Sequence, residues 1–192
     1  MMSFYNLILS RRSIRQFKPE PLSREILEKL VNAARLAPSA ANIQPLEYIV
    51  VDDKELKQKL FPCLRWAAYI APKGDPRPGH EPAAYIVILV NSSLREKAYE
   101  YDVGAAVENI ILAAWEHRVG SCWIISVERD KVQEMLKIPS AYRIDSVIAL
   151  GFPDEKPVVE EMKDSVKYWK DEEGRLHVPK RGLKDIIHFN GF

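Results

Sequence analysis

The chain has 192 residues, with 28 Lys and Arg against 27 Asp and Glu and a formal net charge of +1. This balance leaves no strong field to steer the molecule toward nucleic acid or an anionic membrane, so neither partner is expected. The length allows one compact domain with a sizeable apolar core. No apolar run approaches the roughly 20 residues of a membrane helix, and the start of the chain does not resemble a secretory signal, so a cytoplasmic protein is predicted.

Helices and strands alternate through the first third of the chain. A short helix is predicted over Phe4–Ser10. Ser23 can cap a second helix, whose apolar residues follow the 3.6-residue period until Pro38 ends it. The alternating, β-branched stretch Leu46–Val51 predicts a strand, and Lys54–Leu60 a short helix.

Residues 62–82 are expected to be irregular, because five prolines and two glycines fall within them. A long irregular segment between core elements is typical of a surface loop or lid. Beyond it the pattern predicts buried strands and a central helix, and after residue 156 the sequence becomes polar with a turn at 171–174. The expected elements are a strand at 84–90, a helix at 94–117, a strand at 121–127, a helix at 129–136 and a strand at 144–150.

Several chemistries lack their motifs. The chain has no GxGxxG turn, no HExxH and no GxSxG, which excludes a Rossmann dinucleotide site and offers little support for zinc or triad hydrolysis. Gly74 and Gly79 have P-loop spacing, but His80 follows where a P-loop needs Lys. Cys63 and Cys122 occur in no ligand spacing, so free buried thiols and no metal site are expected.

A basic cluster follows the first helix, with Arg11, Arg12, Ser13 and Arg15 close together. Guanidinium groups bind phosphate oxygens in a fork, and a serine hydroxyl adds a donor, so the cluster could clamp an anion. The alternative is a solvated, charged helix end, which is equally common for such a run.

Ordered motifs along the chain resemble the nitroreductase family. These are RRSIRQF at 11–17, APSAANIQP at 37–45, VGSCWI at 119–124, IALGFP at 148–153 and a basic close at 178–188. The resemblance covers nearly the whole chain. It implies an α+β fold with a mainly antiparallel central sheet flanked by helices, and an intertwined homodimer. Residues 1–192 would form a single FMN-binding domain, with 62–82 as lid or loop and 157–192 as a C-terminal extension.

The resemblance also implies which residues meet FMN. The partner subunit would donate the loop after the second helix, although loop capping is the ordinary role for Asn42 and Gln44. Some relatives carry an acidic residue and Gly at the end of the third strand, and this chain does not. Trp123 is more simply interpreted as a core aromatic. The implied contacts are Arg11, Arg12, Ser13 and Arg15 with Lys180 or Arg181 for the phosphate and ribityl chain, Pro38, Ser39, Asn42 and Gln44 from the partner, and Ile124, Ile125 and Ser126 near flavin N5.

The implied activity is a ping-pong transfer of two electrons from NADH or NADPH through FMN to a small oxidised acceptor, such as a nitroaromatic, a quinone or a flavin. No catalytic side chain is expected, since protons can arrive from solvent. Trp66 and Tyr69 could stack on a planar substrate, or pack against the body instead. The alternatives are a reductive dehalogenase, a flavin-fragmenting enzyme or a non-catalytic flavin- or anion-binding module.

Overall fold

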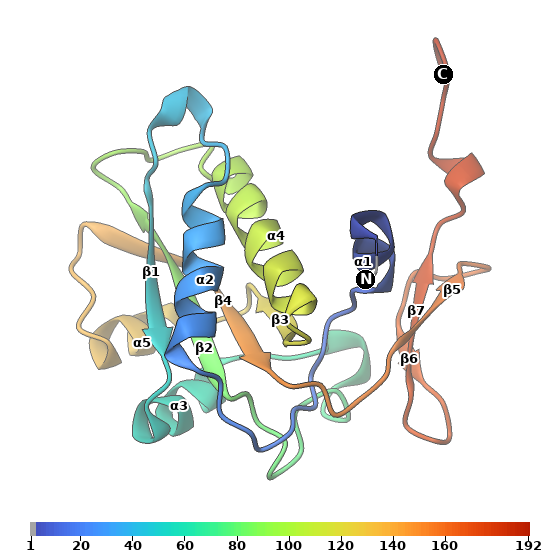
Figure 1. Ribbon diagram of the computed structural model, residues 1–192, viewed down its shortest axis with the longest axis horizontal. Helices are drawn as coiled ribbons and strands as arrows, with labels where there is room; N and C mark the ends of the chain where they lie inside the picture. The colour runs from blue at the N-terminus through green and yellow to red at the C-terminus, as the bar shows by residue number, and fades with distance from the viewer. Residues whose placement is uncertain (1–2) are drawn as a thin grey trace.

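A computed structural model describes residues 3–192 of the chain. Its centre is a four-stranded sheet in the order β1, β2, β4, β3, and every neighbouring pair is antiparallel (Figure 1). Helices cover both faces of this sheet, so the expected α+β architecture is confirmed. The strands are β1 (Leu46–Val51), β2 (Ala84–Asn91), β3 (Gly120–Ile124) and β4 (Tyr142–Gly151).

Helices α2 (Arg24–Arg35) and α4 (Glu100–Glu116) pack side by side over one face of the sheet (Figure 1). The start of α2 is fixed by Ser23, whose Oγ accepts a hydrogen bond from the Ile26 amide at 3.3 Å. Apolar residues at helical spacing then face the sheet. The cluster on this face includes Leu27, Leu30, Ile86, Ile88, Val107, Ile110, Ile148 and Leu150.

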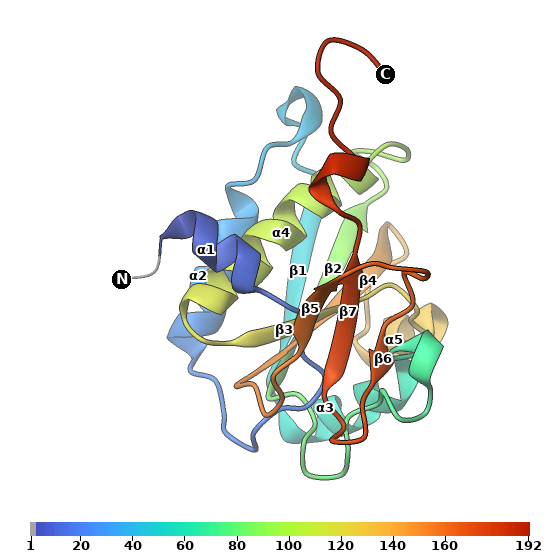
Figure 2. The same ribbon diagram turned by 90° about the vertical axis from the view of Figure 1, so that its right-hand side faces the viewer.

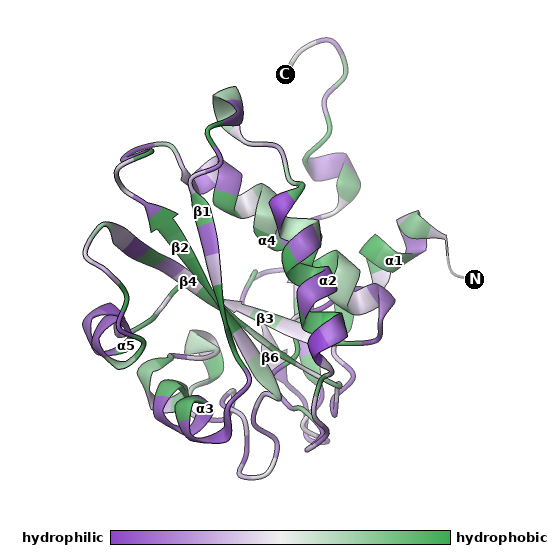
Figure 3. Cartoon of the chain, turned by 60° about the vertical axis from the view of Figure 1, so that its left-hand side comes forward, coloured by the Kyte–Doolittle hydropathy of each residue, from purple (hydrophilic) through white to green (hydrophobic). Residues whose placement is uncertain are grey.

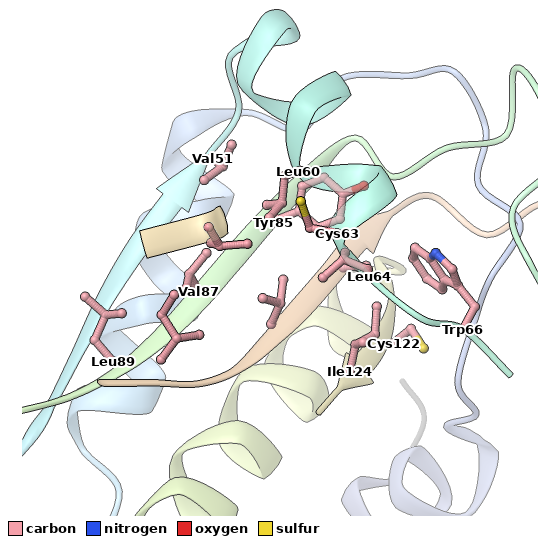
Figure 4. Packing of buried hydrophobic residues seen from close by; sticks show 14 of the residues in the cluster. Val51, Leu60, Cys63, Leu64, Trp66, Tyr85, Val87, Leu89, Cys122 and Ile124 are labelled. Atoms are coloured by element: carbon pink, nitrogen blue, oxygen red, sulfur yellow. The ribbon is translucent and has the colours of Figure 1, made fainter. Parts of the chain in front are cut away.

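Helices α3 (Lys54–Leu60) and α5 (Arg129–Met135) lie on the opposite face, where a second apolar cluster forms. The Asp53 carboxylate caps α3 by accepting from the Leu56 amide at 2.9 Å. Figure 4 shows this cluster packed between the strands and the segment that follows α3. Its members include Val51, Leu60, Leu64, Trp66, Tyr85, Val87, Cys122 and Ile124.

The hydropathy of β1 and β2 differs according to their positions at the edge and in the middle of the sheet (Figure 3). Strand β2 is central and apolar along its length, because helices cover both of its faces. Strand β1 lies at one edge and mixes apolar with polar residues. The expected strand pattern for these two segments is therefore confirmed, with β2 extending one residue further, to Asn91.

The C-terminal residues form a second, smaller sheet that the sequence did not predict. Strands β5 (Val158–Glu161), β6 (Trp169–Lys170) and β7 (Leu176–Lys180) are ordered β5, β7, β6, with β5 parallel and β6 antiparallel to β7. We call it the C-terminal sheet. It stands beside the body in Figure 1 and is seen in front of it in Figure 2, while helix α1 (Phe4–Ser10) projects nearby.

The central helix is shorter than its apolar period predicts. Helix α4 begins at Glu100 and not at residue 94. The Asn91 side chain accepts from the Ser93 amide and starts a turn, and Ala98 then adopts a left-handed φ of 57°, which interrupts a helix. No helix within residues 3–192 is long and apolar enough to cross a bilayer.

Strand β3 also ends earlier than predicted, at Ile124 instead of residue 127. The chain leaves β4 there and turns toward the segment after α3, where Val127 forms an isolated bridge with Leu64. That segment, residues 62–82, is irregular as expected. Its short helical turns lie at Phe61–Cys63 and Ala68–Ile70.

Candidate functional site

Residues 11–18, which we call the N-terminal segment, run closely along the body. The Ile14 amide donates to the Ser121 carbonyl at 2.9 Å, and the Lys18 amide donates to the Phe152 carbonyl at 2.8 Å. Two glycines permit this approach. A Cβ on Gly120 would lie 2.7 Å from Ile14 Cγ1, and a Cβ on Gly151 would lie 2.9 Å from the Phe17 ring. The backbone of the basic cluster is therefore fixed by core packing.

The guanidinium groups of this cluster are only partly exposed and carry no acidic partner. Among residues 3–192, no carboxylate oxygen lies within 4 Å of the guanidinium nitrogens of Arg11, Arg12 or Arg15. Arg12 donates to the Arg11 carbonyl. Burial, and then the charge of Arg11, lower the pKa of Arg12. Three cationic side chains thus share one short segment without a salt bridge to any of their guanidinium groups among the described residues.

Arg15 is partly buried, like the other members of the cluster. Its Nε is buried and donates to no acceptor in the described chain. Its backbone amide donates to the Glu155 carboxylate, and its guanidinium carbon lies 5.4 Å from the centre of the Tyr168 ring. Burial raises the pKa of the Cys122 thiol, and the neighbouring Arg15 charge opposes that rise. A buried donor without an acceptor is unusual, and an anion supplied from outside would satisfy it.

A cavity adjoins the cluster. It has a volume of about 690 Å³, and Arg12, Ile14, Trp115 and Glu155 contribute to its lining. The indole nitrogen of Trp115 donates to the Ser10 hydroxyl at 2.9 Å, which ties the end of α1 to α4. Of the basic cluster, Arg12 lines this open space, whereas Arg11, Ser13 and Arg15 do not.

Residues 39–44, which we call loop 39–44, are held by a buried carboxylate that the sequence did not single out. Asp102, only 3% exposed, accepts from the Ser39 hydroxyl at 2.7 Å and the Ala40 amide at 3.2 Å. The Ser39 Oγ in turn accepts from the Gln44 amide at 2.9 Å. Arg95 donates to the Ala40 carbonyl. The predicted helix began at residue 94 and placed Asp102 in its interior, so the sequence did not indicate that this carboxylate caps a loop.

The tip of loop 39–44 points outward. Ala41, Asn42 and Gln44 all have left-handed φ values, between 53° and 55°, and the exposed side chains include Pro38, Asn42 and Gln44. In Figures 1 and 2 the loop stands at the far end of α2, well separated from α1 and the N-terminal segment. Within one chain, the two sets of expected FMN contacts are therefore apart.

The residues expected beside the flavin ring divide in two groups. Ile124 is buried in the core, whereas Ile125 is 60% exposed and Ser126 is exposed. The Ser126 carbonyl accepts from the Arg65 amide at 3.0 Å. Trp123 is 40% exposed and donates from Nε1 to Ser146 at 2.7 Å, so it is not the fully buried core aromatic that we preferred from the sequence.

Lys180 and Arg181 lie at the end of the C-terminal sheet and are both exposed. The Lys180 carbonyl accepts from the Met162 amide, and the Arg181 guanidinium donates to the Asp185 carbonyl. Neither forms a salt bridge within residues 3–192. Both side chains are exposed to solvent, and the choice between them stays open.

The two aromatic candidates for substrate contact have different environments. Trp66 is 8% exposed and packs in the core, with its ring 5.8 Å from that of Phe61, so the packing interpretation applies to it. Its Nε1 donates to no acceptor among residues 3–192. Tyr69 is 56% exposed and its ring lies 4.9 Å from that of Tyr168. The substrate hypothesis therefore narrows to Tyr69.

Comparison with known proteins fits this arrangement. A relative from Archaeoglobus fulgidus, named "Putative NADH dehydrogenase/NAD(P)H nitroreductase", is 35% identical over 80% of this chain and 88% of its own. The FMN-dependent nitroreductase of Clostridium difficile R20291 is 28% identical, with a TM-score of 0.71 over 98% of this chain and 99% of that one. A Parabacteroides distasonis structure shares the fold, with 24% identity and a TM-score of 0.74 over all of both chains. The model of the nitroreductase family matches residues 8–152. This chain therefore belongs to the nitroreductase family.

Proposed function

We propose that the protein holds FMN and passes two electrons from NADH or NADPH to a small oxidised acceptor, such as a nitroaromatic, a quinone or a flavin, in a ping-pong reaction. The names of its relatives, one FMN-dependent and one an NAD(P)H nitroreductase, support this function. FMN would supply the redox chemistry, while the protein supplies position, electrostatics and access. No side chain is assigned as acid or base, because protons can come from solvent.

One observation carries the proposal: Arg15 has a buried Nε without an acceptor, in a cluster whose guanidinium groups form no salt bridge within residues 3–192. Leaving a buried donor unpaired costs about 1–3 kcal/mol, and more for a charged group, so an anionic ligand is favoured there. A phosphate matches the guanidinium fork and accepts from several donors at once. Arg11, Arg12, Ser13 and Arg15 would hold the phosphate and ribityl chain, with Lys180 or Arg181.

The rest of the flavin would lie toward the end of β3. There the backbone of Ile124, Ile125 and Ser126 would border the isoalloxazine ring, and the exposure of Ile125 leaves room for such a contact. Tyr69 would face the substrate from residues 62–82. These assignments use backbone and apolar contacts only, so they do not depend on the acidic residue that some relatives carry.

We propose further that the active protein is a homodimer in which Pro38, Ser39, Asn42 and Gln44 reach the partner's flavin. Their separation from the N-terminal segment within one chain supports a shared site (Figures 1 and 2). Exposed apolar side chains support an interface, since monomeric proteins rarely leave many together. Helix α1 buries none of its residues, and the large exposed apolar side chains include Phe4, Tyr5, Leu9, Tyr101 and Phe189.

A cytoplasmic location is proposed as well. Cys63 and Cys122 are both buried and free. Free thiols are usual where glutathione and thioredoxin keep cysteines reduced.

Flavin binding tests the function directly. The purified protein should be yellow and release FMN, and anaerobic NADH or NADPH should bleach it. Arg15→Ala should weaken the binding of FMN at least tenfold and the binding of riboflavin much less, because only FMN has the phosphate. Each charge-assisted hydrogen bond contributes about 1.5–3 kcal/mol to binding. Isothermal titration of apoprotein with both ligands measures the difference.

Arg24→Ala is the matched control, since that arginine is exposed on α2 and pairs only with Asp52. It should leave both affinities unchanged. A protein that takes up no FMN would refute the function, and equal weakening of both ligands by Arg15→Ala would place the phosphate elsewhere.

A further inference from the structure

The C-terminal sheet lies outside residues 8–152, the part matched by the family model, yet it contacts two residues of the proposed site. Both contacts are made by Tyr168, which directly precedes β6. Tyr168 is partly buried, although it belongs to a stretch whose neighbours on either side are exposed.

The first contact is with Arg15. The guanidinium carbon lies over the Tyr168 ring, 5.4 Å from its centre, within the range of a cation–π interaction. A ring holds the flat face of a guanidinium and leaves its in-plane N–H groups free to donate. A carboxylate partner would instead occupy those donors. The contact therefore restrains Arg15, while its buried Nε keeps no acceptor within the described residues.

The second contact is with Tyr69. The two rings are 4.9 Å apart at an angle of 53°, and the Tyr69 amide donates to the Tyr168 hydroxyl at 3.4 Å. A neighbouring contact acts in the same direction, because Lys170 Nζ donates to the Lys73 carbonyl at 2.9 Å. The C-terminal sheet thus fastens the segment around residues 68–73 at two points.

We propose that Tyr168 is a positioning residue that orients Arg15 for the phosphate of FMN and anchors Tyr69 beside the substrate. The inference rests on the proposed function. It assigns the C-terminal sheet a part in cofactor affinity, because the Tyr168 ring contacts both Arg15 and Tyr69. Tyr168 itself need not touch FMN.

The ring and the hydroxyl can be tested separately. Tyr168→Leu removes both contacts and should weaken FMN about fivefold, while riboflavin binding changes less than twofold. Tyr168→Phe keeps the ring and should bind FMN as the wild type does. In an Arg15→Ala background, Tyr168→Leu should cause no further loss for FMN, because the residue acts through Arg15. Titration of apoprotein with each flavin provides these constants.

A second readout needs no flavin. Amide hydrogen exchange of residues 68–73 in apoprotein should accelerate in Tyr168→Leu, and the Tyr69 amide should also lose protection in Tyr168→Phe, which lacks the accepting oxygen. Trp169→Leu is the matched control. It alters the same sheet, but its ring stacks on His177 and not on Arg15, so the ratio of FMN to riboflavin affinity should stay unchanged.

Several results would overturn the inference. They are a Tyr168→Leu protein with wild-type discrimination between FMN and riboflavin, losses that add fully to those of Arg15→Ala, or an equal effect from Trp169→Leu. A wild-type protein that binds no FMN would refute the proposed function and this inference together. If the wild type binds FMN through Arg15 and Tyr168→Leu has no effect, only the inference fails.

Discussion

The N-terminal segment and loop 39–44 are both proposed to meet FMN, but different forces hold them. The segment is placed by backbone hydrogen bonds and by the close approach of Ile14 to Gly120. The loop depends on hydrogen bonds to the carboxylate of Asp102, and its tip has exposed, left-handed residues. The proposed phosphate site is thus fixed by the backbone packing of the N-terminal segment, whereas the loop proposed to meet a partner chain is held by one carboxylate.

Asp102→Ala removes the carboxylate that holds loop 39–44 and should have the largest effect on stability. It leaves the Ser39 hydroxyl and the Ala40 amide without their acceptor. Because hydrogen bonds to charged groups contribute about 1.5–3 kcal/mol, we expect a loss of about 3 kcal/mol in the free energy of unfolding. Urea denaturation measures this loss, and the flavin content of the purified protein should fall. Wild-type stability and flavin content would mean that Asp102 does not hold the loop.

Gly120→Ala breaks the segment side. The added Cβ would lie 2.7 Å from Ile14 Cγ1 and 2.9 Å from Ile14 Cβ, so the N-terminal segment must move. Overpacking of this kind costs about 1–3 kcal/mol, so we expect the free energy of unfolding to fall by about 2 kcal/mol. FMN binding should also weaken. Gly104→Ala is the control, because a Cβ there meets nothing within 4 Å and α4 should gain stability. Equal thermal midpoints for the wild type and Gly120→Ala would contradict the expectation.

Tyr69→Ala tests whether the substrate is contacted by residues 62–82, in addition to the N-terminal segment and loop 39–44. Loss of an exposed ring should lower kcat/KM for aromatic acceptors about fivefold relative to small ones, with FMN content unchanged. Steady-state kinetics over a panel of acceptors provides the ranking. Trp66→Phe changes the core and should preserve that ranking. A uniform decrease for every acceptor, or loss of flavin, would assign Tyr69 a structural role instead.

The smallest expected effect concerns pH and the C-terminal sheet, which reaches the N-terminal segment through Tyr168. His177 lies between two carboxylates, with Nε2 3.1 Å from Asp171 and Nδ1 3.0 Å from Glu160. The hydrogen bond to Asp171, followed by that to Glu160, raises the pKa of His177. A neutral imidazole donates only once, so both contacts are satisfied only in the protonated ring.

The sign follows from these shifts. The contribution of His177 is fully present below its ordinary pKa of about 6.5 and is lost as pH rises through its raised value. A hydrogen bond from His177 lowers the pKa of Asp171. Hydrogen bonds from Trp169 and then His177 lower the pKa of Glu160. The contribution of these two carboxylates to stability is therefore lost as pH falls below about 4. The sheet should be most ordered between these limits. Trp169 fluorescence should report it, because that ring stacks on His177 at 4.1 Å.

His177→Asn should abolish the alkaline change in fluorescence, whereas His117→Gln, at the exposed end of α4, should retain it. An unchanged transition in His177→Asn would assign the titration to another group.

Much of the fold could be predicted because local signals agreed with tertiary packing. Ser23 caps its helix as predicted, and the alternation of Leu46–Val51 matches an edge strand. The predicted start of α4 was wrong because Leu94–Tyr99 contains no Pro or Gly to stop a helix, whereas the turn at Asn91 is set by a side-chain hydrogen bond. Hydropathy alone carries no information on such a turn.

The C-terminal sheet was missed for a related reason. Its strands are short and mix apolar with polar residues, and β5 pairs with β7 across an intervening segment, as in the contact of His177 with Glu160. The same holds for Tyr168 and Asp102 in the site. Each acts through a neighbour that only the fold brings near, and neither residue type nor spacing distinguishes it from a surface residue.

The bond between Ile14 and Ser121 also bears on solubility. Strand β3 is an edge of the main sheet, and edge strands with unpaired backbone groups recruit strands from other molecules. The bridge from Ser13 to Ser121 places the chain's own backbone along part of that edge. The arginine cluster that we propose for phosphate thus belongs to a segment that also shields β3 from intermolecular pairing. A chain lacking residues 1–18 should therefore aggregate because β3 is exposed, independently of any loss of flavin binding.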